Sequence, residues 1–145
     1  MLGLIQRVSS ASVTVDGVVV GSIGRGLLLL LGVEREDGPE QVARLLKKVL
    51  NYRVFADHEG KMNLSLRSVG GGLLVVSQFT LAASTDQGLR PGFSSAKSPA
   101  EAELLYLEFV RQAKAQHDPV ACGRFGADMQ VALTNDGPVT FLLKA

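Results

Sequence analysis

The sequence predicts a mixed α/β fold in which a multi-stranded sheet, or a β-barrel-like core, carries two main helices packed on it. Alternating apolar residues separated by turn residues occur near both ends of the chain, and two amphipathic segments between them begin with helix-start signals. No repeat, low-complexity tract or linker interrupts the 145 residues, of which 46% are hydrophobic. We therefore expect residues 1–145 to form a single domain with a buried core.

The first third of the chain is predicted to be rich in strands. Apolar residues alternate on both sides of Asp16-Gly17, which is typical of a β-hairpin with a two-residue turn. The segment 26–34, GLLLLLGVE, is apolar on both faces and is expected to be a central strand of the sheet.

The first helix is predicted to begin at Asp37 as the N-cap, with Pro39 in the first turn and Glu40 three residues after the cap. Its apolar residues recur at helical spacing and predict one buried face, made of Val42, Leu45, Leu46, Val49 and Leu50.

The second helix is predicted to begin at Ser98 as the cap, followed by Pro99 and by Glu101 as the acidic residue of a capping box. Leu105, Phe109 and Ala113 form its apolar stripe.

Further strands are expected around residues 73–84, near Val120, and on both sides of the segment 134–140, TNDGPVT. The composition of TNDGPVT predicts a turn that joins two strands, MQVALTN and VTFLLK. Gly137-Pro138 is more restrictive than a plain hairpin turn requires, which suggests a further role for this pair.

The balance of charge and the single cysteine indicate the setting of the protein. Fifteen Lys and Arg against fourteen Asp and Glu give a net charge of +1, so any contact with a polyanion must be local. Cys122 has no partner for a disulfide, Arg7 interrupts the apolar run of a signal peptide, and the longest apolar run, 27–31, is too short to span a membrane. These features predict a cytoplasmic protein without a membrane segment.

No familiar catalytic or cofactor motif is present. His58 and His117 lie in polar segments without metal-ligand spacing and are expected to be solvated loop residues, and Cys122 is expected to be a small core residue. The glycine run 70–72 lacks the Lys-Ser/Thr ending of a phosphate loop. We therefore expect neither a metal nor a cofactor.

Ser77, Gln78 and Thr80 are unusual because they lie within the apolar segment 73–84. Strand alternation would put Gln78 and Thr80 on one face and Ser77 and Phe79 on the other, unless a bulge or the strand end brings them together. Ordinary strand residues with Gln78 facing solvent are the alternative.

The combination of SQFTL at 77–81 with TNDGPVT resembles the two signature motifs of the D-aminoacyl-tRNA deacylases, formerly called D-tyrosyl-tRNA deacylases. The similarity extends to IQRVSSASVTVDG, GKMNLSL, RPGFSSA and GRFGADMQVAL and so covers nearly the whole chain. The resemblance implies a cytoplasmic homodimer that hydrolyses the ester of D-aminoacyl-tRNA, and also of glycine mischarged on alanine tRNA.

The resemblance also implies roles for individual residues. Ser77, Gln78 and Thr80 are assigned to catalysis, and Phe79 to binding of the terminal adenosine and the aminoacyl group. Gly137 and Pro138, joined by a cis peptide bond, are expected to enter the active site of the partner subunit and to reject L-amino acids. Substrate-binding roles are also implied for two further residues of the second motif region, Met129 and Asn135.

Two mechanisms remain open. Thr80 is a candidate nucleophile, but a hydroxyl at neutral pH needs an adjacent base, and neither motif supplies one other than Asp136. We favour hydrolysis assisted by the ribose 2′-OH, with backbone N–H groups near Phe79 and Thr80 stabilising the oxyanion.

The loop 84–94 differs from many family members because it contains Asp86, Gln87 and Gly92 and only one cation, Arg90. This composition predicts a limited phosphate contact by the loop. Two other functions were weighed, a non-catalytic RNA-end binding module and a general esterase. The intact motifs disfavour the first, and the lack of a nucleophile elbow disfavours the second.

Overall fold

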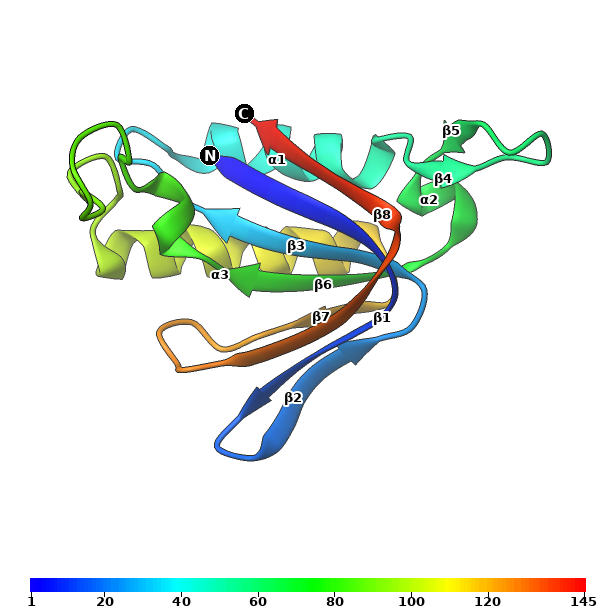
Figure 1. Cartoon of the computed structure of the whole chain (residues 1–145), viewed down its shortest axis with the longest axis horizontal. Helices are drawn as coiled ribbons and strands as arrows, with labels where there is room; N and C mark the ends of the chain where they lie inside the picture. Colours follow the sequence, from blue (N-terminus) through cyan, green and yellow to red (C-terminus); the bar gives the residue numbers. More distant parts are fainter.

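The computed structural model describes residues 1–145 and has the predicted mixed α/β architecture (Figure 1). Its strands are β1 Leu2–Val15, β2 Val18–Ile23, β3 Gly26–Gly32, β4 Phe55–Ala56, β5 Met62–Leu64, β6 Gly72–Ser77, β7 Val120–Cys122 and β8 Gln130–Lys144. Its helices are α1 Pro39–Asn51, the short α2 Leu66–Val69, the 3₁₀ turn η1 Phe79–Ala82, and α3 Pro99–Gln116. The two main helices and the central strand were predicted, whereas α2 was not.

The main sheet has the order β2-β1-β3-β6-β7, and β8 pairs with the other edge of β1. The strand β1 is long enough to pair with β3 through its first half, with β2 through its second half, and with β8 along both. The sheet curls so that β2 approaches β7: a Cβ on Gly21 would lie 2.6 Å from the carbonyl oxygen of Cys122. The sheet is therefore a nearly closed, barrel-like core, as the sequence predicts.

The apolar run of β3 separates two hydrophobic cores. Leu27, Leu29 and Leu31 pack in the core beneath the helices, whereas Leu28 packs in the core inside the curled sheet. Both faces of β3 are thus covered, which explains why its sequence is continuously apolar rather than alternating.

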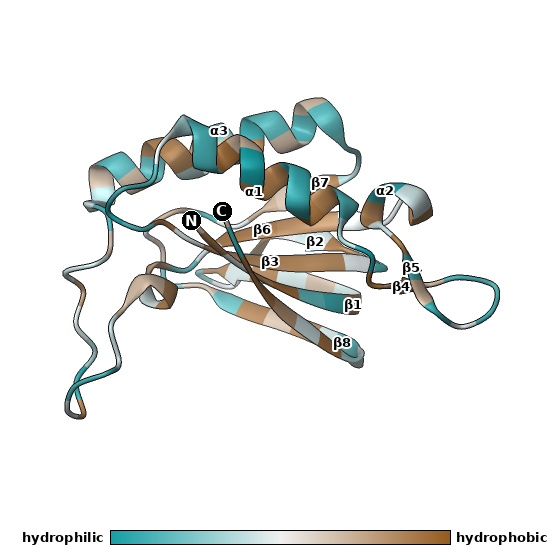
Figure 2. Ribbon diagram, turned by 90° about the horizontal axis from the view of Figure 1, so that it is seen from above, coloured by the Kyte–Doolittle hydropathy of each residue, from teal (hydrophilic) through white to brown (hydrophobic).

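The helices α1 and α3 lie side by side on one face of the sheet and turn their apolar sides towards the strands (Figure 2). The predicted buried face of α1 is confirmed at all five positions. In α3, Phe109 and Ala113 are buried as expected, but Tyr106 rather than Leu105 completes the buried stripe.

The predicted cap of α1 is wrong by one residue. Gly38 is the N-cap, and its N–H donates to the side chain of Gln41 at 2.9 Å, so Glu40 has no capping role. Ser98 does cap α3, but its hydroxyl bonds the Glu101 carboxylate rather than a backbone N–H. The helix-start residues in the sequence therefore locate the beginnings of these helices to within one residue, but they do not predict which hydrogen bonds form there.

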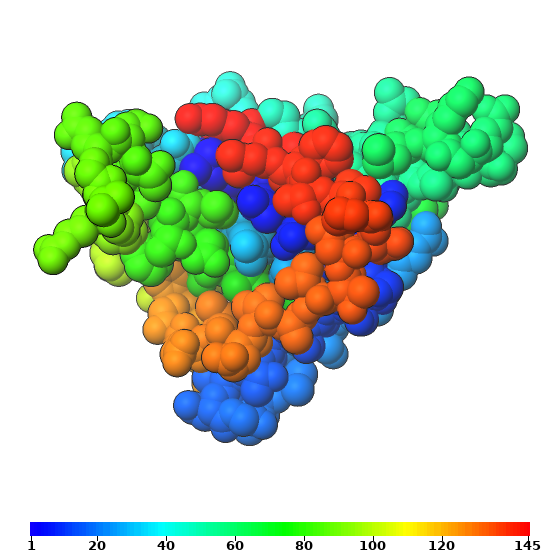
Figure 3. Space-filling view, in the orientation of Figure 1, coloured from blue at the N-terminus to red at the C-terminus, as the bar shows by residue number.

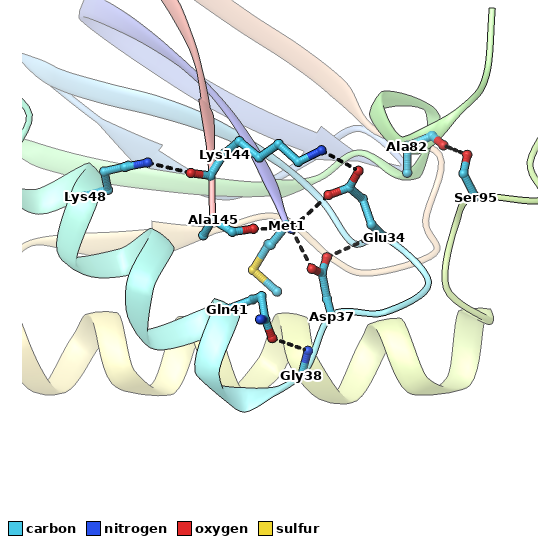
Figure 4. A network of polar contacts seen from close by, with 10 residues as sticks. All are labelled: Met1, Glu34, Asp37, Gly38, Gln41, Lys48, Ala82, Ser95, Lys144 and Ala145. Carbon is cyan, nitrogen blue, oxygen red and sulfur yellow. Dashed lines mark hydrogen bonds and ion pairs between the residues drawn. The ribbon is translucent and has the colours of Figure 1, made fainter.

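Asp37 is instead part of a buried ionic network with the amino group of Met1 (Figure 4). The Met1 ammonium donates to Asp37 Oδ1 at 2.6 Å, to Glu34 Oε2 at 3.0 Å and to the Ala145 carbonyl at 3.0 Å. Burial acts to raise the pKa of the Glu34 carboxyl, but the ammonium, through its hydrogen bond and its charge, holds that pKa below its ordinary value. The network joins both ends of the chain to the β3–α1 connection.

The hairpin at Asp16-Gly17 is confirmed, and both residues have positive φ angles, 49° and 76°. The turn predicted at TNDGPVT is wrong. Residues 130–144 form one strand, and both of its halves pair with β1, with Val8 opposite Asn135 and Gln6 opposite Thr140. Residues 136–139 therefore form a bulge opposite Arg7 and do not reverse the chain.

No helix of the structure combines the length and the apolar character that crossing a membrane requires.

We predict that Asp37→Asn lowers the free energy of unfolding by about 3 kcal/mol or more, because it leaves a buried ammonium without its closest counter-charge. Chemical denaturation measures this loss. Glu40→Gln is the matched control because it removes an exposed carboxylate from its ion pair with Arg44, which should cost less than about 1 kcal/mol. Equal denaturation midpoints for the two variants would contradict the role given to Asp37.

Candidate active site

A pocket of about 460 Å³ opens where the parallel strands β3 and β6 end. Ten of its fifteen lining residues are hydrophobic, so a few polar groups must orient any ligand in it. Its walls come from the ends of β3 and β6, the start of α3 and the segment that leads into β8. In Figure 3 the green surface that contains η1 and the orange surface before β8 border the same face of the molecule.

The first wall forms because β6 ends at Ser77. The N–H of Gln78 still donates to the Leu31 carbonyl at 2.8 Å, after which the chain enters the 3₁₀ turn η1. Strand alternation is lost at this point, and Ser77, Gln78 and Phe79 all line the pocket. The strand end thus brings these three residues together, which was one of the two possibilities left open by the sequence.

Thr80 lies beside the pocket and is exposed. Its hydroxyl accepts a hydrogen bond from Gln78 Nε2. Phe79 and Thr80 are the first two residues of η1, so their backbone N–H groups have no acceptor within the turn. The turn therefore presents two N–H donors and a fixed hydroxyl next to the pocket.

The opposite wall consists of Phe125, Gly126, Ala127 and Met129. Met129 packs closely on Gly123, where a Cβ would lie 2.7 Å from its sulfur. The predicted site residue Met129 thus lies in the same pocket as Ser77, Gln78 and Phe79, although about fifty residues separate them in sequence.

Tyr106 forms the floor between the two walls. Its hydroxyl donates to the Val75 carbonyl at 3.0 Å and lies 3.4 Å from the Gly123 carbonyl, while its ring lies 5.7 Å from that of Phe125. Burial raises the pKa of Tyr106, with a smaller contribution from Cys122, so the phenol is neutral at physiological pH. Tyr106 therefore braces the two walls.

The sequence did not identify Tyr106, Phe125 or Lys97 as site residues. Lys97 is the only charged residue that lines the pocket. Phe125 lies in the GRFGAD segment of the family resemblance, and that segment could have identified it as a site residue. Tyr106 could not be identified in this way, because its position in the sequence is typical of the buried side of a helix.

Asn135, Gly137 and Pro138 lie outside the pocket of their own chain. Asn135 braces the bulge of β8, because its Oδ1 accepts from the Val139 N–H at 2.8 Å and its Nδ2 donates to Thr140 Oγ1 at 2.9 Å. The Gly137-Pro138 peptide bond is cis, as the resemblance implies, and so is Asp118-Pro119, which was not expected.

Arg7 connects the bulge to the body of the protein. Its Nε donates to the Asp136 carbonyl at 2.9 Å and its Nη1 to the Val54 carbonyl at 2.7 Å. The side chain of Arg7 is only 16% exposed, and its hydrogen bond to Val54 is partly buried, whereas the one to Asp136 lies at the surface. The backbone just before Gly137 is thereby fixed.

The other candidates singled out in the sequence lie elsewhere. His117 is not a solvated loop residue, because its Nε2 lies 2.6 Å from the Gly71 carbonyl. Cys122 is half-buried against the core, and no cluster of three or more His, Cys, Asp or Glu side chains has the arrangement of a metal site.

Comparison with known proteins gives the family. The D-aminoacyl-tRNA deacylase of Stutzerimonas stutzeri (strain A1501) is 63% identical over 145 residues, which is 100% of both chains. That of Saccharophagus degradans (strain 2-40) is 59% identical over 140 residues, or 97% of each chain.

Two solved structures share the fold. The c-Myc DNA Unwinding Element Binding Protein superposes with a TM-score of 0.95 at 40% identity, over 100% of this chain and 99% of the other. A probable eukaryotic D-amino acid tRNA deacylase gives a TM-score of 0.76 at 16% identity, over 99% and 98% of the two chains, and so supports the fold alone. Residues 4–144 match the family described as D-Tyr-tRNA(Tyr) deacylase, and the chain belongs to that family.

Proposed function

We propose that the protein removes D-amino acids from tRNA at the Ser77–Thr80 turn, and that Gly137-Pro138 of a partner subunit screens the chirality of the substrate. The activity itself, deacylation of D-aminoacyl-tRNA by ester hydrolysis, follows from membership of the family. The observation that carries the assignment of the site is the end of β6, where a turn with two available backbone N–H groups borders a largely apolar pocket.

The pocket suits the terminal adenosine with its aminoacyl group. Its volume of about 460 Å³ lies in the range of small-molecule sites, and its apolar walls can cover a base and a side chain. The ester would then lie against η1, where the N–H groups of Phe79 and Thr80 are directed at the developing oxyanion. Ser77 and Gln78 would orient the ribose and the ester from the same turn.

The residues around the turn favour assistance by the substrate. The lining residues include no carboxylate and no imidazole, and the Thr80 hydroxyl bonds Gln78 rather than the one pocket lysine, Lys97, so no base is positioned to make this hydroxyl a nucleophile. Thr80 instead holds Gln78 through their hydrogen bond. The ribose 2′-OH is then the group that orients or activates the attacking water.

Chirality would be screened by backbone rather than by side chains. The bulge of β8 is exposed, yet Arg7 and Asn135 hold it in one conformation. Carbonyl groups on such a loop accept hydrogen bonds from the substrate ammonium when the substrate side chain points away, as in a D-residue or in glycine. An L-residue would direct its Cβ into the same backbone, so glycine mischarged on alanine tRNA would also be a substrate.

A homodimer would bring this loop to the pocket of the other subunit. The strand β8 exposes apolar side chains on both faces: Leu142, opposite Leu4, is 60% exposed, whereas Phe141, on the helix side, is 37% exposed and packs edge-on against Tyr52. An apolar strand surface next to the loop supports a self-complementary interface.

One assay compares the candidate activities. We expect release of the amino acid from D-Tyr-tRNA, and no comparable release from L-Tyr-tRNA or from a simple activated ester. Rapid cleavage of the activated ester would indicate a general esterase instead.

We predict that Leu142→Glu yields a monomer without deacylase activity, because a charge would be buried in the β8 interface. Sedimentation and D-Tyr-tRNA deacylation measure the two effects. Leu107→Glu is the matched control, since Leu107 is 52% exposed on α3, away from β8. A fully active monomer of either variant at micromolar concentration would contradict the composite site.

We predict that Thr80→Ala keeps substantial activity, whereas replacing the terminal ribose with its 2′-deoxy form removes most of it. Single-turnover deacylation of D-Tyr-tRNA gives both rates. Removal of an essential nucleophile costs about 10⁴-fold or more. A loss of that size in Thr80→Ala would show that Thr80 is the nucleophile.

We predict that Gly137→Ala damages D-substrate cleavage or L-rejection while the protein remains folded. The added Cβ would lie 2.7 Å from Val139 Cγ2 and 2.9 Å from the Val139 nitrogen, at a φ angle of 143°. Because this strain falls on the exposed bulge, the melting temperature should change little. Gly24→Ala is the control, since nothing lies within 4 Å of its added Cβ. Unchanged D- and L-Tyr-tRNA rates in Gly137→Ala would remove the loop from the screen.

A further inference from the structure

A hollow on the outer side of α1 carries a concentration of positive charge that the site described above does not use. Its lining includes five cationic side chains and no acidic one, namely Arg44, Lys47, Lys48, Arg67 and Lys144. We call these five residues the basic face. All five are exposed, and three of them belong to α1, whose outer side is hydrophilic in Figure 2.

Most of this charge is not neutralised within the protein. Arg44 pairs with Glu40, and Lys144 lies 3.4 Å from Glu34. Lys47, Lys48 and Arg67 make no ion pair; Lys48 donates to the Lys144 carbonyl and Arg67 to the side chain of Gln116. The basic face therefore keeps a positive charge of about three on a chain whose net charge is only +1.

The end of α1 explains only part of this concentration. Lys47 and Lys48 lie near the carboxyl end of the helix, where cations stabilise the helix dipole. Arg67 and Lys144 come from α2 and β8, and that effect does not account for their position beside α1. Two exposed acidic residues, Glu101 and Glu103, lie instead on α3. Three separate elements thus contribute cations to one surface.

We infer that the basic face binds the sugar–phosphate backbone of the tRNA acceptor arm, in addition to the contact made at the pocket. This inference rests on the proposed function, which supplies a tRNA as the polyanion of complementary charge. The basic face would also supply phosphate contacts that the loop 84–94 cannot, because Arg90 is the only cation of that loop.

The position of the basic face fits the duplex part of the acceptor arm. Pro99 lines the pocket and Gln116 lines the basic hollow, so the two sites lie at opposite ends of α3. Eighteen helical residues span about 27 Å. Even at the rise of about 3.4 Å per nucleotide of duplex DNA, which exceeds that of an A-form RNA duplex, this distance corresponds to at least roughly eight paired nucleotides. The basic face would therefore contact phosphates of the paired stem rather than the unpaired 3′ end.

The test compares two triple variants, each of which removes three positive charges. Lys47→Gln/Lys48→Gln/Arg67→Gln neutralises the unpaired part of the basic face. Lys61→Gln/Arg111→Gln/Lys114→Gln is the control. Lys61 and Arg111 take part in exposed ion pairs elsewhere, and Lys114 points to the side of α3 opposite Gln116, since two helical residues differ by about 200°.

Binding of uncharged tRNA by the dimer, measured between about 50 and 200 mM salt, is the direct readout. We expect the basic-face variant to bind roughly tenfold more weakly than the parent at the lower salt concentration. The slope of log affinity against log salt should fall by about two, because each lost phosphate contact removes about 0.7 to 0.9 from it. The control variant should bind like the parent.

Hydrolysis of 3′-O-(D-tyrosyl)adenosine, which lacks an acceptor stem, separates this inference from the proposed function. The basic-face variant should cleave it like the parent and show a raised KM only with D-Tyr-tRNA. Equal losses on both substrates, or tRNA binding equal to that of the control, would overturn the inference. A third outcome would also overturn it: the basic-face variant binds phosphatidylserine vesicles more weakly than the parent but binds tRNA equally well. A parent that binds tRNA through the basic face but cleaves neither ester would contradict the proposed function and support the inference.

Discussion

The parallel pairing of β3 with β6 is the interaction on which the rest of the structure depends. It runs from Gly26 opposite Gly72 to Leu31 opposite Ser77, and both hydrophobic cores pack against it. At its start the strands approach so closely that a Cβ on Gly26 would lie 1.9 Å from the Gly72 carbonyl oxygen. At its end the chain turns into η1. The same pairing therefore sets the layers of the fold and the position of the candidate site.

The candidate site combines a rigid frame with features that regular strands cannot provide. The turn after Ser77 frees two N–H groups, because the first residues of a helical turn have no internal acceptor. The bulge of β8 releases four residues from a strand whose two halves stay paired with β1. Arg7 and Asn135 then hold those residues through charge-assisted and side-chain hydrogen bonds. The turn is held by β6 before it, and the bulge by the two paired halves of β8, which gives the rigidity that the proposed discrimination between enantiomers requires.

The distribution of charge gives the proposed tRNA contact a place outside the pocket. Although the net charge is only +1, cations of α1, α2 and β8 gather on one surface, while the exposed carboxylates of Glu101 and Glu103 lie on α3. Such a separation guides a polyanion to one side of the molecule without making the whole protein adhere to nucleic acid. The pocket has Lys97 as its only charged lining residue, so recognition there depends on shape and on backbone groups.

The sequence by itself determined the elements and the family. Apolar periodicity predicted α1, α3 and the central strand, because burial of one face or two leaves a direct pattern in the chain. The paired motifs at 77–81 and 134–140 predicted the family and the site residues Ser77, Gln78, Phe79 and Met129, which the structure brings together. Three features of the protein were decided only by the tertiary structure. The single strand through Gly137-Pro138 depends on pairing with the distant β1, the role of Asp37 depends on the amino group of Met1, and the basic face depends on three elements meeting. Local sequence carries no signal for such contacts, because their partners are fixed only when the chain has folded.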